Sequence, residues 1–101
     1  MKTIPDNAIC YKSTAVFTQD TIPAALLRSH TTAEHVWGRI TVLEGSLLYR
    51  ITDPAVEPEE WLLDVHCRGV VEPKIQHEVA LLGPVRFQVD FHRIPAAPTG
   101  S

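Results

Sequence analysis

Short stretches of alternating apolar and polar residues, separated by turn residues, constrain the fold of this chain most strongly. The clearest stretch is residues 85–92, in which every odd position is apolar and every even position is polar. This alternation is typical of a β-strand with one face in a core and the other in solvent. Residues 36–43 and 60–65 repeat the pattern less regularly. The sequence therefore predicts a protein built from β-strands.

Glycine and proline mark where these stretches end. The glycine-containing turn at residues 44–46 predicts a hairpin between strands 36–43 and 47–52. A second turn, at residues 82–84, ends a strand that begins at His77. Each strand is short, and turn signals recur at roughly ten-residue spacing, as in sandwiches and barrels.

Only residues 24–28 have helix-forming character, and they are so few that a strand and a single helical turn both stay open. Six or seven short strands without a long helix indicate an all-β sandwich or barrel. A barrel of this size has an interior that holds side chains or one small ligand.

The length of the chain sets its domain organisation. We expect residues 1–101 to form one domain with one hydrophobic core. The core should span about residues 11–93, between a flexible N-terminal arm and a proline-rich C-terminal tail.

Charge and hydropathy exclude several classes of partner. The net charge is −3 and there is no basic run, so we expect neither nucleic acid nor an anionic membrane as a partner. No apolar stretch reaches the roughly 18 residues of a membrane span, and the first residues lack the apolar core of a signal peptide. We therefore expect a cytoplasmic protein. Cys10 and Cys67 form no CxxC pair, and we expect both to be reduced.

Histidines and carboxylates are the side chains that can build a site in this sequence. His30 and His35 precede one predicted strand and His77 begins another, so they can face each other across a barrel mouth. Imidazoles and carboxylates are common metal ligands. Glu72 precedes Pro73, whose bend can turn the carboxylate either way. From spacing alone, a metal site and structural, hydrogen-bonded histidines both stay open.

Two segments resemble the motifs of the cupin family. Residues 42–47 look like the end of the first cupin motif, where a glycine turn joins two barrel strands. Gly69, Pro73 and His77 look like the second motif, in which the proline lies four residues before a metal-binding histidine. The first motif departs from its usual form, since the His-x-His pair and the glutamate are absent.

More narrowly, the chain resembles a family of small cupins related to tellurite resistance, which also occurs fused N-terminally to tellurite-resistance methyltransferases. The resemblance covers about residues 11–93. It is carried by residues 23–27 with His30 and Thr31, 36–40, 42–45, Glu72 and Pro73 with His77, and 83–87 with Phe91.

This resemblance implies a cupin-type double-stranded β-helix, or jelly-roll barrel, that forms a homodimer. It also implies one divalent transition metal ion (zinc, iron, nickel or manganese) held by His77 and His30. Glu72 is the expected third ligand and His35 the alternative. The implied function is handling of a small anionic or oxidising species in tellurite or related stress. The other reading is a non-catalytic sensor or binding module for a small-molecule ligand, so whether the protein is an enzyme stays open.

Overall fold

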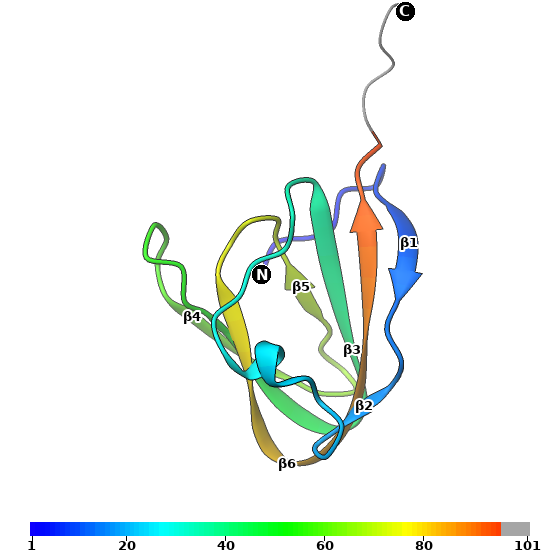
Figure 1. Cartoon of the computed structure of the whole chain (residues 1–101), viewed down its shortest axis with the longest axis vertical. Coiled ribbons are helices and arrows are strands. Elements are labelled where there is room, and N and C mark those ends of the chain that lie inside the picture. The colour runs from blue at the N-terminus through cyan, green and yellow to red at the C-terminus, as the bar shows by residue number, and fades with distance from the viewer. Residues whose placement is uncertain (96–101) are drawn as a thin grey trace, which may run out of the picture.

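A computed structural model of the chain describes residues 1–95, which are almost entirely β-strand and loop. The prediction of an all-β domain is confirmed, and residues 24–27 adopt the single helical turn rather than a strand. The elements in chain order are β1 (Ile9–Ser13), β2 (Phe17–Thr18), the 3₁₀ turn η1 (Ala24–Leu27), β3 (Val36–Ile51), β4 (Glu59–Leu63), β5 (Gly69–Val71) and β6 (His77–Arg93) (Figure 1).

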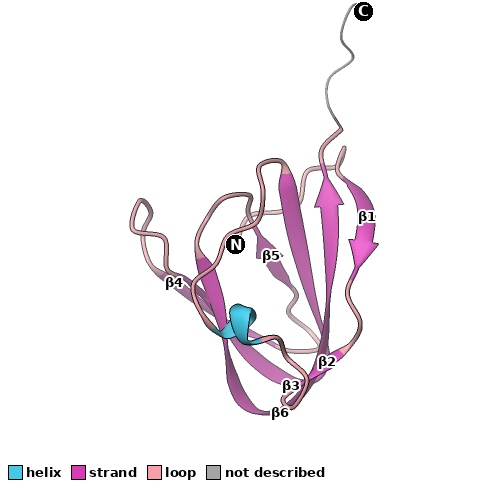
Figure 2. Ribbon diagram, viewed as in Figure 1, coloured by secondary structure: helices cyan, strands magenta, loops and turns pink. Residues whose placement is uncertain are grey.

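Two long strands organise the sheet. β3 and β6 pair antiparallel along nearly their whole lengths, from Val36 opposite Arg93 to Ile51 opposite His77. β5 and β4 pair with successive halves of β3, while β1 and β2 pair with the second half of β6. The six strands form one antiparallel sheet that curls around a core, and η1 lies across its open side (Figure 2).

The predicted hairpin at residues 44–46 is wrong, and so is the turn at residues 82–84. β3 and β6 each continue through their glycines, and Gly45 lies opposite Val85. The register between the strands shifts on both sides of Gly45, so each strand bends there while remaining paired. Two segments that read locally as tight turns therefore form one shared bend in a pair of long strands.

Gly45 is required at this bend for two reasons. Its φ of +77° lies in the left-handed region, which glycine adopts without steric cost. A Cβ at this position would lie 2.2 Å from the carbonyl oxygen of Pro84. The bend therefore depends on a residue without a side chain.

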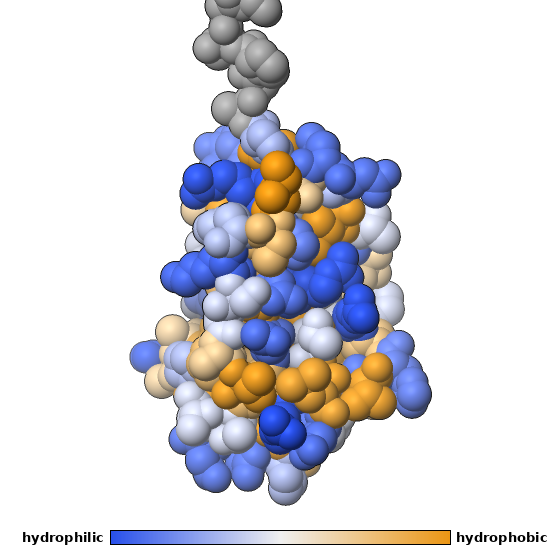
Figure 3. All heavy atoms as spheres, turned by 90° about the vertical axis from the view of Figure 1, so that its right-hand side faces the viewer, coloured by the Kyte–Doolittle hydropathy of each residue, from blue (hydrophilic) through white to orange (hydrophobic). Residues whose placement is uncertain are grey.

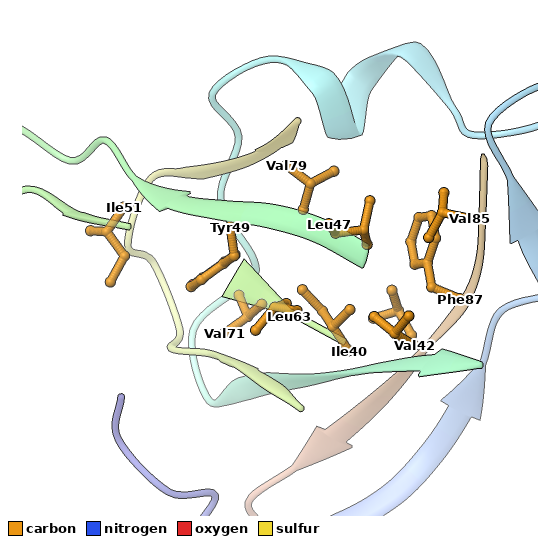
Figure 4. Packing of buried hydrophobic residues seen from close by; sticks show 11 residues of the cluster. Ile40, Val42, Leu47, Tyr49, Ile51, Leu63, Val71, Val79, Val85 and Phe87 are labelled. Carbon is orange, nitrogen blue, oxygen red and sulfur yellow. The ribbon is translucent and has the colours of Figure 1, made fainter. Parts of the chain in front are cut away.

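The core fills the concave side of the sheet (Figure 4). The alternation in residues 85–92 is confirmed, because Val85, Phe87 and Val89 are buried while Arg86 is exposed. In β3 the buried positions change from even to odd across the bend, as the bulge requires. The buried cluster comprises Ile40, Val42, Leu47, Tyr49, Ile51, Leu63, Val71, Val79, Val85, Phe87 and Val89.

The two ends of the chain were predicted to be an arm and a tail. At the N-terminal end, β1 pairs with β6, and Met1 packs partly buried against the core. Of the proline-rich tail, residues 96–101 lie outside the described residues. Within residues 1–95, no helix has the length and apolarity needed to cross a bilayer.

Candidate functional site

A small cavity lies inside the curled sheet beneath η1. Its volume is about 170 Å³. A cavity of about 150 Å³ lined by apolar side chains is large enough to hold benzene. The lining residues are mostly apolar: Thr14, Phe17, Pro23, Leu26, His30, Gly38, Ile40, Val71, His77, Val79, Phe87, Val89 and Phe91. The cavity is therefore large enough for a small molecule, and its walls are mostly apolar.

Backbone hydrogen bonds place His30 and His77 side by side in this lining. The amide of each residue donates to the carbonyl oxygen of the other, both at 2.9 Å. The two imidazole rings meet edge to face, with their centroids 4.1 Å apart. The structure thus brings together the two histidines that the sequence placed on facing segments.

The segment between β5 and β6 fixes the position of His77. Lys74, after the Pro73 bend, has a φ of 62°, and its amide donates to the carbonyl oxygen of Thr32 at 3.1 Å. The hydroxyl of Thr32 donates to the carbonyl oxygen of Glu72 at 3.2 Å. The chain before β3 and the chain before β6 are therefore tied together next to the histidine pair.

Each histidine is held in one tautomer. Nδ1 of His30 lies 2.9 Å from the carbonyl oxygen of Arg28, and Nδ1 of His77 lies 2.8 Å from that of Ile75. Because a carbonyl oxygen only accepts, Nδ1 must be the protonated donor in each ring. In a neutral imidazole this leaves Nε2 as a hydrogen-bond acceptor. Among residues 1–95, no side chain or backbone group bonds to either Nε2 atom.

Burial keeps His77 neutral. Its side chain is 3% exposed, and desolvation lowers its pKa from 6.5 to about 4. The bond to Ile75 opposes this shift, while the nearby His30 adds to it. The ring of Tyr49 lies beside His77 with centroids 5.9 Å apart, and burial raises the pKa of its phenol. The side chains of His77 and Tyr49 are thus uncharged at neutral pH.

The structure does not bring Glu72 or His35 to the histidine pair. The carboxylate of Glu72 lies 3.0 Å from the ammonium of Lys2, and Glu72 is not part of the pocket lining. Val71 points into the core, so strand alternation directs Glu72 outward. His35 is exposed and lies 3.7 Å from Glu34 in a loop. Neither residue lines the cavity, since His35 is exposed and Glu72 lies partly buried beside Lys2.

Of the four residues that the resemblance implies as metal ligands, the structure brings His30 and His77 together. Within residues 1–95, no group of three or more histidine, cysteine, aspartate or glutamate side chains converges on one point. The chemistry of His30 and His77 does suit a metal, because metal-bound histidines commonly donate their other nitrogen to a backbone carbonyl. Within the described residues, the imidazoles of His30 and His77 lie side by side and no carboxylate side chain converges on them.

Sequence reasoning missed most of the pocket wall. Leu26 in η1 and Phe17 in β2 close the cavity, yet both lie in segments too short to show a periodic pattern. Gly38 interrupts the apolar face of Val36, Ile40 and Val42. A Cβ there would lie 3.2 Å from the Cβ of Val71, so this glycine accommodates the side chain of Val71, and it also lines the cavity.

The fold and the site together define a class: an all-β domain with a small internal pocket and a paired histidine. The chain belongs to the TehB-like domain family, whose sequence profile matches residues 12–89. The resemblance to the tellurite-resistance-related family is therefore confirmed at the level of the TehB-like domain.

This chain is similar to a longer protein, the probable S-adenosyl-L-methionine-dependent methyltransferase TehB of Haemophilus influenzae strain Rd. The two are 34% identical over 73 aligned residues. That alignment covers 55% of this chain and 26% of the methyltransferase. The chain thus spans about a quarter of the length of this curated relative.

Two solved structures share the fold. A protein from Escherichia coli K12, determined by structural genomics, superposes with a TM-score of 0.84 at 26% identity, covering 95% of this chain and all of that one. TehB from Haemophilus influenzae superposes with a TM-score of 0.80 at 27% identity, covering 88% of this chain and 32% of TehB. The same fold is thus found in a chain of similar length and as part of a longer chain.

Proposed function

We propose that this TehB-like domain is a binding module for a small molecule, and that its ligand occupies the pocket beneath η1. The observation that carries the proposal is the histidine pair: two imidazoles oriented by backbone carbonyls, with their Nε2 atoms unpaired, in an otherwise apolar cavity. Neither Nε2 is among the fully buried side-chain atoms without a partner, so each keeps some accessible surface that a ligand can reach. A ligand that donates a hydrogen bond there would satisfy a polar atom that the surrounding apolar walls leave unpaired. A concave apolar site with a few convergent polar groups is also the usual form of a ligand pocket.

The test is a fragment screen by nuclear magnetic resonance on the ¹⁵N-labelled full chain. Hits should shift the amide signals of pocket residues such as Val79 and Phe91. Val89→Phe, which places a ring in the cavity, should abolish these shifts. Leu62→Phe, on the exposed face of β4, is the matched control and should retain them. Hits that shift residues elsewhere, or that survive Val89→Phe, would count against the proposal.

A second candidate is a metal-binding domain, favoured by the tautomer of the two histidines. His30 and His77 would supply two nitrogen ligands to a divalent zinc, iron, nickel or manganese ion. A small anionic or oxidising species would complete the coordination in place of a third protein ligand. Such an ion would supply Lewis acidity at the pocket. Elemental analysis of protein purified without a metal column tests this candidate, with about one equivalent expected in the wild type and loss in His30→Phe.

The proposal extends to the fold family and the biological setting. We propose that the curled sheet is a cupin-type jelly roll, which is supported by the way the sheet curls around its core and by the internal pocket. A role in tellurite or related stress rests on the similarity to TehB. The test produces the wild type or Val89→Phe in the cytoplasm of a strain that lacks the gene. Tellurite tolerance that is restored by the wild type and not by Val89→Phe would support this role.

We also propose that the protein forms a homodimer. Apolar side chains form two groups on the face on the β1 side, one in its upper part and one in its lower part, with polar side chains between them (Figure 3). On β1, Ile9 is 60% exposed and Tyr11 is 48% exposed. Exposed apolar patches commonly mark protein contacts. Sedimentation of the wild type and of Ile9→Lys would show whether a dimer forms through this face.

A further inference from the structure

The atoms that face the cavity restrict what it can bind. Among the lining residues, only Thr14, His30 and His77 have polar side chains, and none is cationic. The Thr14 hydroxyl is already engaged, since it donates to the carbonyl oxygen of Ala15 at 2.8 Å and accepts from the amide of Val89 at 3.1 Å. The unengaged polar atoms of these side chains are therefore the two Nε2 atoms.

Both Nε2 atoms are acceptors when the imidazoles are neutral, because each Nδ1 carries the ring proton. An oxyanion also offers only acceptors, so it would lie against two lone pairs with no cation to balance its charge. Burying an unpaired charge in such surroundings costs far more than burying a neutral group. The lining thus disfavours anions and favours a ligand that donates a hydrogen bond.

Resting on the proposed binding function, we propose that the pocket takes a neutral, mostly apolar molecule of about the size of one benzene ring that carries a hydrogen-bond donor. The class includes phenols and compact alcohols. The O–H or N–H of the ligand donates to Nε2 of His77 or His30. Its apolar body lies against Phe17, Leu26 and the neighbouring wall.

Four probes of similar size separate the contributions. Phenol is neutral and has a donor, toluene has no polar group, anisole has an acceptor without a donor, and benzoate is an anion. Titrations by nuclear magnetic resonance at about pH 8 keep phenol and free imidazoles neutral and benzoate ionised. We expect phenol to bind roughly tenfold more tightly than toluene or anisole, which is the effect of one net hydrogen bond. Benzoate should not bind in the pocket.

His77→Phe removes the acceptor while keeping a ring of similar shape. If His77 accepts the hydrogen bond, phenol and toluene should bind His77→Phe with equal affinity, and if His30 accepts it, His30→Phe should show this equality. The exposed variant His66→Gln should keep the preference for phenol in either case. The double variant of both histidines should lose it.

Two failures can be told apart. Anisole or benzoate binding in the pocket as tightly as phenol, or a preference for phenol that survives removal of both imidazoles, would overturn the proposed ligand class while leaving the pocket as a binding site. No shifts around the pocket with any of the four probes would overturn the binding function itself.

Discussion

The interior of the curled sheet has two regions that differ in what they contain. Beside the shared bend, Leu47 and Leu63 are fully buried and belong to the hydrophobic core cluster. Where β6 begins, the same sheet encloses a cavity and a pair of histidines. The comparison indicates that the packing of the bend region stabilises the fold, while the region at the start of β6 retains polar side chains and empty space.

The largest effect should come from emptying the bend region. Leu63→Ala removes a side chain with no exposed surface, and such substitutions cost roughly 2–5 kcal/mol in the free energy of unfolding. Chemical denaturation measures this loss. Leu62→Ala on the same strand is the control, since Leu62 is 55% exposed and a surface substitution changes stability by about 0.5 kcal/mol or less. Equal losses in both variants would contradict the distinction.

The next effect concerns how the free energy of unfolding depends on pH through His77, in the region that contains the histidine pair. The pKa of His77 is about 4 when folded and 6.5 without the fold, so the unfolded chain binds more protons between these values. The contribution of His77 to stability is complete above pH 6.5 and declines as the pH falls toward 4. The free energy of unfolding should fall by roughly 2 kcal/mol between about pH 7 and pH 5.

Denaturation of chelator-treated protein across this range measures the decline. His77→Phe should flatten the curve, while His66→Gln, at an exposed position, should leave it unchanged. If the slope is the same in His77→Phe as in the wild type, a group other than His77 causes it.

The strands were predictable because alternation is a local property of the sequence. Val85, Phe87 and Val89 show it over five residues, and no distant partner is needed to interpret it. The prediction of a hairpin failed because the bend depends on a partner that is distant in the sequence. Gly45 faces Val85 across the sheet, and local turn chemistry does not distinguish a hairpin from a bend shared by two distant strands.

The candidate site divides in the same way. The proximity of His30 and His77 follows from their places at the starts of facing segments, and the structure shows it. Their role as metal ligands stays a prediction. The outward orientation of Glu72 depends on strand alternation after Val71 and on Lys2, which lies far away in the sequence. The bend at Pro73 alone did not indicate either factor.

A smaller effect is expected at the cover of the pocket. Leu26→Ala shortens a partly buried side chain beside a cavity that already exists, so it creates less new empty volume than Leu63→Ala. The loss of stability should be about 1 kcal/mol. Binding of toluene and other pocket ligands should weaken as well, because the cover contributes contact area. Unfolding measurements and ligand titrations on one variant therefore report on both regions. A loss as large as that of Leu63→Ala would show that η1 belongs to the stabilising core.

The smallest effect should follow from changing Glu72. Its bridge to Lys2 joins two side chains that are 24% and 71% exposed, and pairs of this kind contribute at most about 1 kcal/mol. Glu72→Gln should therefore lower stability only slightly, with a loss that shrinks as salt concentration rises. It should not alter binding in the pocket, since the carboxylate points away from it. Lys2→Gln is the matched control and should produce the same small, salt-dependent loss. If Glu72→Gln abolished ligand or metal binding while Lys2→Gln did not, the carboxylate would have to turn inward to join His30 and His77, and the two-histidine description of the site would be wrong.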